Sequence, residues 1–128
     1  MDREKLAAMG RAIARKNRAE RERLQRELAE RIDAAWAEVQ RLTEAFRAMD
    51  PELRQVILFG SLAEGRARSL SFDIDLAVDS DRYLQLVSVA LESPFRVDVV
   101  DLRSASAYIR EAISRFGKVL YDKRQTSV

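Results

Sequence analysis

The sequence contains no cysteine and no histidine among its 128 residues, and it has only two prolines and four glycines. Without cysteine, the chain cannot form a disulfide, a thiolate metal site or a cysteine nucleophile, which is typical of proteins in a reducing compartment. Without histidine, it lacks the usual general base, the imidazole metal ligands and the Ser-His and Cys-His catalytic pairs. Any catalysis must therefore use carboxylates, hydroxyls, lysine, arginine or the backbone.

Long apolar runs are also missing. No stretch approaches the roughly 18 apolar residues that span a bilayer, and the first residues lack the apolar region of a signal peptide. We therefore expect a cytoplasmic protein with no membrane partner. Hydrophobic residues make up 47% and charged residues 34% of the chain, a balance that predicts one globular domain. The net charge of +2 is too small to indicate nucleic-acid binding by itself, so a nucleic acid is not the partner we expect first.

Residues 3–49 contain a single glycine and no proline, and their composition predicts a helix nearly throughout. Apolar residues recur at three- and four-residue steps in two groups: first Leu6, Met9 and Ile13, then Leu24, Leu28, Ile32, Ala35, Trp36, Val39, Leu42 and Phe46. The second group should pack on the core, whereas the first has little core left to cover and indicates pairing in a homo- or hetero-oligomer. Between them, residues 14–23 are mostly charged and form either an exposed helix or a break between two helices. The basic residues that crowd this part are either a solvated helical face or a surface for a partner or a nucleic acid: Arg11, Arg15, Lys16, Arg18, Arg21, Arg23 and Arg26.

After Asp50-Pro51 the pattern changes to short strands and helices. Strands are predicted over residues 55–59, 72–78, 95–102 and 118–121, and helices over residues 62–68, 83–91 and 104–116. The three tyrosines, Tyr83, Tyr108 and Tyr121, are predicted to be packing residues. The fold class is α+β: a small mixed β-sheet with helices mainly on one face, preceded by a long N-terminal helix. We divide the chain into an N-terminal helical extension (1–50), a core (51–122) and a polar tail (123–128).

Three aspartates stand out in the predicted strands. Asp73 and Asp75 are two positions apart, so their side chains leave the same face. Asp98 lies in a strand that is otherwise fit for burial, where an ionised carboxylate is costly unless it is paired or bound to metal. An all-oxygen site with no histidine or cysteine suits Mg²⁺ or Mn²⁺.

The dipeptide Gly60-Ser61 follows the first predicted strand and opens a helix. Such a turn points backbone N–H groups and a hydroxyl at an anion, which suits a phosphate. Arg66 and Arg68 could add positive charge at the rim. By itself, a Gly-Ser pair is more often a simple turn.

Taken together, the Gly-Ser turn and the aspartates are a more specific indication of function than either is alone. Residues 59–68 (FGSLAEGRAR) followed by residues 72–78 (FDIDLAV) resemble the motif of the DNA polymerase β-like nucleotidyltransferase superfamily. The resemblance covers residues 55–121 and includes Asp98 within Val97-Asp98-Val99. In size and layout the chain resembles the minimal nucleotidyltransferases, the MntA-like antitoxins of HEPN/MNT pairs.

The resemblance implies a Mg²⁺-dependent nucleotidyltransferase that moves a nucleoside monophosphate, AMP from ATP, to a hydroxyl on a partner protein. It implies that Gly60 and Ser61 hold the triphosphate, and that Asp73, Asp75 and Asp98 ligate the metal. Asp98 would also help to deprotonate the attacking hydroxyl. The implied partner is a HEPN-domain ribonuclease toxin, which this chain would neutralise as its antitoxin.

Two positions depart from the family pattern. Phe72 stands where the family usually has serine, and Glu64 stands where such proteins often carry arginine or lysine. A second interpretation therefore stays open, in which the chain is a catalytically weak or inactive nucleotidyltransferase fold that acts by complex formation.

Overall fold

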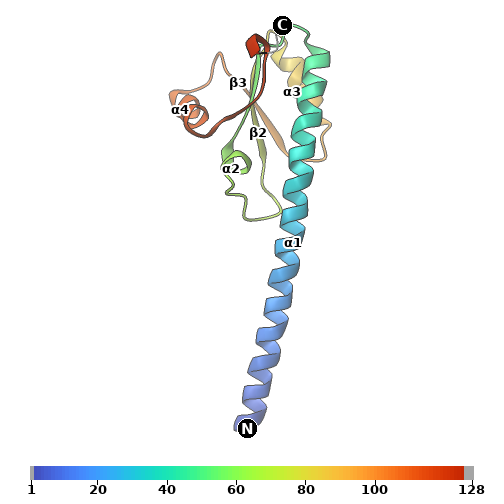
Figure 1. Ribbon diagram of the computed structural model, residues 1–128, viewed down its shortest axis with the longest axis vertical. Coiled ribbons are helices and arrows are strands. Elements are labelled where there is room, and N and C mark those ends of the chain that lie inside the picture. Colours follow the sequence, from blue (N-terminus) through green and yellow to red (C-terminus); the bar gives the residue numbers. More distant parts are fainter. Residues whose placement is uncertain (1, 126–128) are drawn as a thin grey trace.

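The computed structural model describes residues 2–125, which form one long helix followed by a four-stranded sheet with short helices (Figure 1). The elements are α1 (Arg3–Met49), β1 (Gln55–Phe59), α2 (Gly60–Ala63), β2 (Ile74–Asp79), α3 (Tyr83–Leu91), β3 (Val97–Asp101), α4 (Ala107–Phe116), β4 (Lys118–Asp122) and a final 3₁₀ turn, η1 (Lys123–Gln125). The predicted fold class, α+β with a mixed sheet and a long N-terminal helix, is confirmed.

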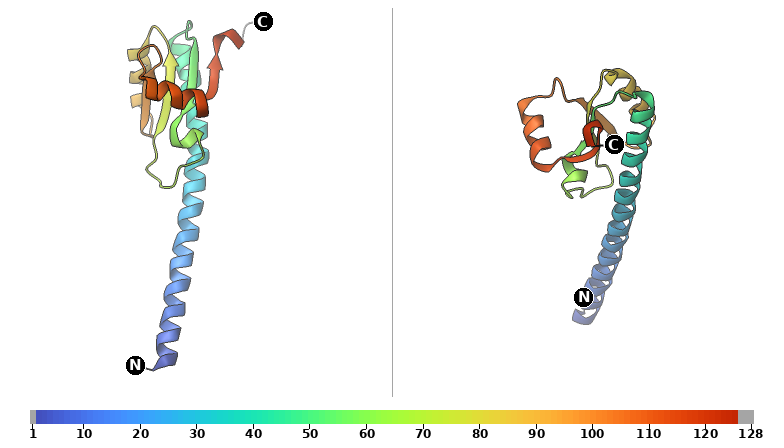
Figure 2. Two further views of the ribbon diagram at one scale, coloured as in Figure 1. Left: turned by 90° about the vertical axis from the view of Figure 1, so that its left-hand side faces the viewer. Right: turned by 45° about the horizontal axis from the view of Figure 1, so that its top comes forward.

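Helix α1 is continuous from Arg3 to Met49, so the charged stretch is exposed helix and not a break. Asp2 caps its start, since the carboxylate accepts a hydrogen bond from the Glu4 N–H at 3.1 Å. The helix ends where Pro51 follows Asp50. Its second half lies along the sheet, whereas its first half projects far beyond the domain (Figures 1 and 2).

The strand order of the sheet is β3-β2-β1-β4, with β1 antiparallel to both β2 and β4 and with β2 parallel to β3. Register assigns the residues to two faces. Val56 opposes Val78 and Leu58 opposes Leu76 on one face, while Phe59 opposes Asp75 on the other.

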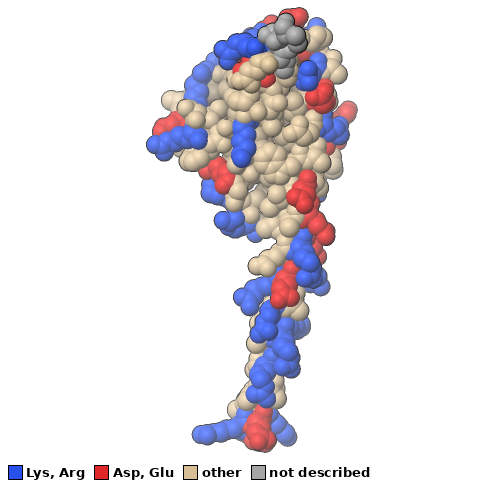
Figure 3. Space-filling view, viewed as in Figure 1, with Lys and Arg blue, Asp and Glu red and all other residues tan. Residues whose placement is uncertain are grey.

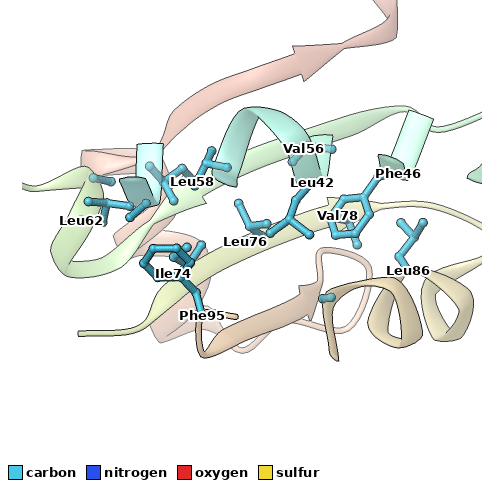
Figure 4. Close-up of a cluster of buried hydrophobic side chains, with 14 of the residues drawn as sticks. Leu42, Phe46, Val56, Leu58, Leu62, Ile74, Leu76, Val78, Leu86 and Phe95 are labelled. Atoms are coloured by element: carbon cyan, nitrogen blue, oxygen red, sulfur yellow. The ribbon is translucent and has the colours of Figure 1, made fainter. Parts of the chain in front are cut away.

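The hydrophobic core lies on the first of these faces, under α1 and α3 (Figure 4). Its largest fully buried side chains include Leu42 and Phe46 from α1, Ile74 from β2 and Leu86 from α3. Burying each of them stabilises the fold by about 1.5–3 kcal/mol. Helix α4 lies across the opposite side of the sheet and contributes no buried residue, so the helices cover mainly one face (Figures 1 and 2).

Several predicted boundaries are wrong by a few residues. The predicted helix over 62–68 is instead the short α2, because Gly65 turns the chain with φ +69° and the Arg66 N–H bonds back to the Ser61 carbonyl at 2.8 Å. Strands β2 and β3 each begin two residues later than predicted, whereas β4 begins at Lys118 as predicted. Helix α4 begins after Ser106, whose hydroxyl accepts a bond from the Ile109 N–H.

The expected polar tail begins with η1, while residues 126–128 lie outside the described part of the chain. The division into an extension, a core and a tail stays a prediction. Among the helices described, none has the length and apolar character needed to cross a membrane.

Candidate active site

The sheet places two of the three predicted aspartates side by side on the face opposite the core. Asp75 on β2 pairs in register with Asp98 on the neighbouring parallel strand β3. Adjacent strands lie about 4.8 Å apart, so the two carboxyl groups leave the same face at close range. Asp73 lies immediately before β2, which begins at Ile74, and therefore belongs to the connecting loop and not to the strand as predicted.

Asp75 is the most perturbed carboxyl of the group. Its burial, together with the nearby negative charges of Asp98 and Asp73, raises the pKa of Asp75 to about 6. A negative charge on Asp75 is therefore unfavourable beside these two carboxylates when no cation is bound. The crowding is thus the electrostatic condition under which a bound divalent cation would be stabilised.

Asp73 supplies a second observation that fits a cation. Its Oδ1 is buried and has no hydrogen-bond partner, although the Arg96 Nε lies 3.7 Å away. An unpartnered buried carboxylate oxygen is costly, and a metal ion is one way to satisfy it. The donor set is all oxygen, which suits Mg²⁺.

The side chains of Asp73, Asp75 and Asp98 do not form a complete set of metal ligands in this conformation. Within residues 2–125, no group of three or more Asp, Glu, His or Cys side chains has the spacing to hold a metal ion as it stands. Asp98 is exposed, so its side chain is free to change rotamer toward the other two carboxylates. Asp73 and Asp75 are therefore the residues best placed to hold a cation, with Asp98 able to join them.

Gly60 joins the Gly-Ser turn to the aspartates. It has φ +81°, a conformation that favours glycine, and a Cβ built on it would lie 2.1 Å from the Asp75 Oδ2. The backbone of the turn therefore lies directly against the Asp75 carboxylate. The predicted phosphate-binding turn and the predicted metal-binding acids are thus parts of a single site.

The remaining predicted nucleotide-binding residues have partners of their own. Ser61 is half-buried in the first turn of α2. The Arg66 Nε lies 3.0 Å from the Glu64 Oε1, and Arg68 donates to the carbonyl oxygens of Gly65 and Ala67. The two arginines are held by nearby residues of the chain, and their role toward a nucleotide stays a prediction.

Sequence reasoning missed two residues near this site. Arg96 precedes β3, and its side chain approaches Asp73. This proximity follows from the hydrogen bond between the Ile74 N–H and the Arg96 carbonyl, which the sequence does not reveal. Tyr108 was predicted to be a packing residue, but it is 84% exposed on α4. Glu64 and, more weakly, Tyr108 raise the pKa of Arg66, so this tyrosine lies near the arginine.

The other two tyrosines do pack against the core, as predicted. The Tyr83 hydroxyl donates to the Val99 carbonyl at 2.6 Å, and Tyr121 lies on β4.

Comparison with known proteins identifies the same family that the motif resembles. The family model described as "Polymerase beta, Nucleotidyltransferase" matches residues 40–126, more than half of the chain. No curated protein sequence matches at a significant level. Three solved structures illustrate the similarity.

The first two are toxin–antitoxin complexes. One, the MntA-HpeT pair carrying a tyrosine-to-alanine substitution, is 32% identical over 66% of this chain and 72% of that one, with a TM-score of 0.54. Another, a toxin–antitoxin crystallised with AMP-PNP, is 29% identical over 67% of this chain and 75% of that one, with a TM-score of 0.52.

The third structure, a nucleotidyltransferase-like protein from Sulfolobus solfataricus, is 16% identical over 79% of this chain and 92% of that one, with a TM-score of 0.56, and shows the fold alone. The family match covers all four strands and the Gly-Ser and Asp-x-Asp segments. The neighbours match a minimal nucleotidyltransferase, and the chain belongs to the polymerase beta nucleotidyltransferase family.

Proposed function

We propose that the chain is a Mg²⁺-dependent nucleotidyltransferase that transfers AMP from ATP to a hydroxyl on a partner protein, and that this partner is a HEPN-domain toxin. The observation that carries the proposal is the contact between the Gly60 turn and the Asp75 carboxylate, with Asp98 in register beside it. A phosphate held by the turn would lie next to the crowded carboxylates.

Each residue contributes a separate part of the reaction. The backbone N–H groups that follow Gly60, together with the Ser61 hydroxyl, bind and orient the triphosphate. Asp73 and Asp75 hold the cation, which supplies charge neutralisation for the phosphates when it is bound. Asp98 is exposed, so it can reach an acceptor hydroxyl and take its proton.

The step balances with these groups. The acceptor oxygen forms a bond to the α-phosphorus, the bond from that phosphorus to the bridging oxygen breaks, and pyrophosphate leaves with the electron pair. The proton of the acceptor hydroxyl passes to Asp98. No histidine is required.

The partner assignment is supported by the neighbours. Both toxin–antitoxin structures are more than 25% identical to this chain and cover about two thirds of it, and one of them contains AMP-PNP. The described residues contain a nucleotide-site candidate but no second domain to present an acceptor. Because both neighbours are toxin–antitoxin structures, a partner protein is the proposed source of the acceptor hydroxyl.

One observation favours the alternative, a catalytically weak or inactive module that acts by complex formation. Glu64 holds the Arg66 guanidinium at 3.0 Å, which neutralises one of the two cations that were predicted to attract phosphate. The same transfer assay decides between the two functions.

The test is transfer of label from α-³²P-ATP, with Mg²⁺, to a HEPN partner. We expect label on the partner with the unaltered chain and none with Asp73→Asn/Asp75→Asn. The control is Asp101→Asn, which removes one carboxylate from the far end of β3 and should leave transfer intact. Absence of label with the unaltered chain, while the complex still forms, would refute transfer and favour the binding module.

A further inference from the structure

Most of the first half of α1 projects beyond the domain (Figures 1 and 2). Every residue from 2 to 27 is exposed. At 1.5 Å per residue, this projecting part is about 38 Å long. Leu6, Met9 and Ile13 are 52%, 52% and 58% exposed on it, although burying such side chains is favourable. The family match begins only at residue 40, so this part lies outside it.

The apolar residues of the projecting part continue a line that starts inside the domain. From Leu6 the steps of three and four residues lead through positions 9, 13, 17 and 20 to Leu24, Leu28 and Ile32, with Asn17 and Glu20 as the polar members. This line of residues lies along one side of α1. We call it the α1 track.

Near the domain, the α1 track borders two grooves that join each other. One of about 410 Å³ lies between Leu28, Ile32 and Trp36 of α1 and Leu62 of α2. The other, of about 500 Å³, lies between Leu24 and Leu28 and the loop at residues 68–71. Leu28 and Arg68 line both grooves, so the apolar surface is continuous from the domain to the projecting part.

Over residues 5–19, the charge around the track is of one sign. Residues 5–19 contain no acid and five basic residues: Lys5, Arg11, Arg15, Lys16 and Arg18. Arg68 and Lys118 continue the positive charge along the groove. The projecting helix is accordingly mainly blue in the space-filling view (Figure 3). An occupant with negative charge beside an apolar strip is therefore complementary to the track.

Other occupants fit less well. A second copy of this chain aligned in parallel would bring its own basic segment against residues 5–19, and like charges facing each other across an interface are unfavourable. A membrane could follow the projecting part but not the grooves, because the domain forms their other wall. A nucleic acid would use the arginines but would leave Leu6, Met9 and Ile13 exposed.

We propose that the α1 track is a docking surface for an acidic amphipathic helix of a partner protein. A helix laid along a helix-lined groove buries residues at three- and four-residue spacing, which is the spacing of the track. The inference rests on the proposed function only in that this partner would also carry the acceptor hydroxyl. Binding itself requires none of the site aspartates.

The test uses the full chain and two synthetic 25-residue helical peptides, with fluorescence anisotropy as the readout. Both peptides carry leucine at three- and four-residue spacing, and their other positions carry glutamate in one peptide and lysine in the other. We expect the glutamate peptide to bind at least about tenfold more tightly, with the difference shrinking at high salt. Equal binding of the two peptides would overturn the proposal.

Variants locate the binding on the track. Met9→Ser/Ile13→Ser should weaken binding of the glutamate peptide about tenfold, whereas Ala8→Ser/Ala19→Ser, on other sides of the same exposed helix, should change it less than about twofold. Lys5→Glu/Lys16→Glu lowers the net charge of residues 5–19 from +5 to +1 and should reduce the preference for the glutamate peptide. Unchanged binding with the Met9→Ser/Ile13→Ser variant would refute the assignment.

Three further measurements distinguish an acidic helix from a second copy of the chain, from a nucleic acid and from an effect of the catalytic site. A dimer in sedimentation equilibrium that dissociates with Met9→Ser/Ile13→Ser would assign the track to a second copy and overturn the proposal. Tighter binding of an RNA duplex than of the glutamate peptide would also overturn it. Asp73→Asn/Asp75→Asn should bind the peptide normally while failing in transfer, so failure of docking and failure of the proposed chemistry are distinguishable.

Discussion

Asp75 should make the metal-free protein less stable at neutral pH than an otherwise identical protein with a neutral side chain there. Its pKa is raised from 3.8 to about 6, mainly by burial and then by Asp98 and Asp73. A difference of that size corresponds to about 3 kcal/mol between the folded and unfolded states. Because the carboxyl keeps some contact with water, we expect about 2 kcal/mol.

The sign follows from proton linkage. Between the unfolded pKa of 3.8 and the folded pKa of about 6, the folded state binds more protons than the unfolded state. The free energy of unfolding therefore falls as the pH rises through this window and is level above it. Asp75→Asn, which is neutral at every pH, escapes this loss. The variant should be about 2 kcal/mol more stable than the unaltered chain at pH 7.5, and the gap should narrow at pH 4.5.

Urea unfolding in EDTA at the two pH values measures this difference. Asp33→Asn is the matched control, because it removes the same charge from an exposed position of α1 and should change stability by less than about 0.5 kcal/mol. Adding Mg²⁺ should stabilise the unaltered chain and not Asp75→Asn. A variant that is equally or less stable at pH 7.5 would refute the view that these carboxylates repel one another in the folded protein.

Three further changes have defined outcomes. Gly60→Ala should destabilise the fold by about 1–2 kcal/mol in urea unfolding, because φ is +81° and the new Cβ meets the Asp75 carboxylate, and it should reduce nucleotidyl transfer more than tenfold. Unchanged transfer in this variant would show that the Gly-Ser turn is not part of the catalytic site. Phe46→Ala should cost about 3–5 kcal/mol, since Phe46 is fully buried in the core, and a denaturation midpoint near that of the unaltered chain would place it outside the core. Deleting residues 1–20 should leave the free energy of unfolding within about 0.5 kcal/mol, because the described residues of this segment are all exposed; a larger loss would show that the projecting helix supports the domain.

The helices and strands could be predicted from the sequence because the patterns that indicate them lie within each segment. The helix over residues 3–49 follows from the absence of proline and from good helix formers, and the strand over residues 55–59 follows from a short apolar run that ends at a glycine. The boundaries around residues 62–74 were less accurate. There, Gly65 and the backbone bonds of the loop, which have no periodic pattern, decide where α2 ends and β2 begins.

The site was predicted as a set of residues but not as a geometry. Sequence spacing alone puts Asp73 and Asp75 on one side of the chain, and the motif adds Asp98 and the Gly60 turn. Whether these groups meet depends on strand order. Only the parallel pairing of β2 with β3 puts Asp98 beside Asp75.

By itself, the sequence determined the element types, the family motif and the exclusion of histidine and cysteine chemistry, because composition and periodicity are properties of the chain. The tertiary structure alone decided the contact of Gly60 with Asp75, the exposure of Tyr108 and the position of Arg96 near Asp73. It also decided how far along α1 the domain extends: the domain covers one side of the second half of the helix, and residues 2–27 stay exposed. These are contacts between residues distant in the chain, and register, sheet order and the site of helix docking set them.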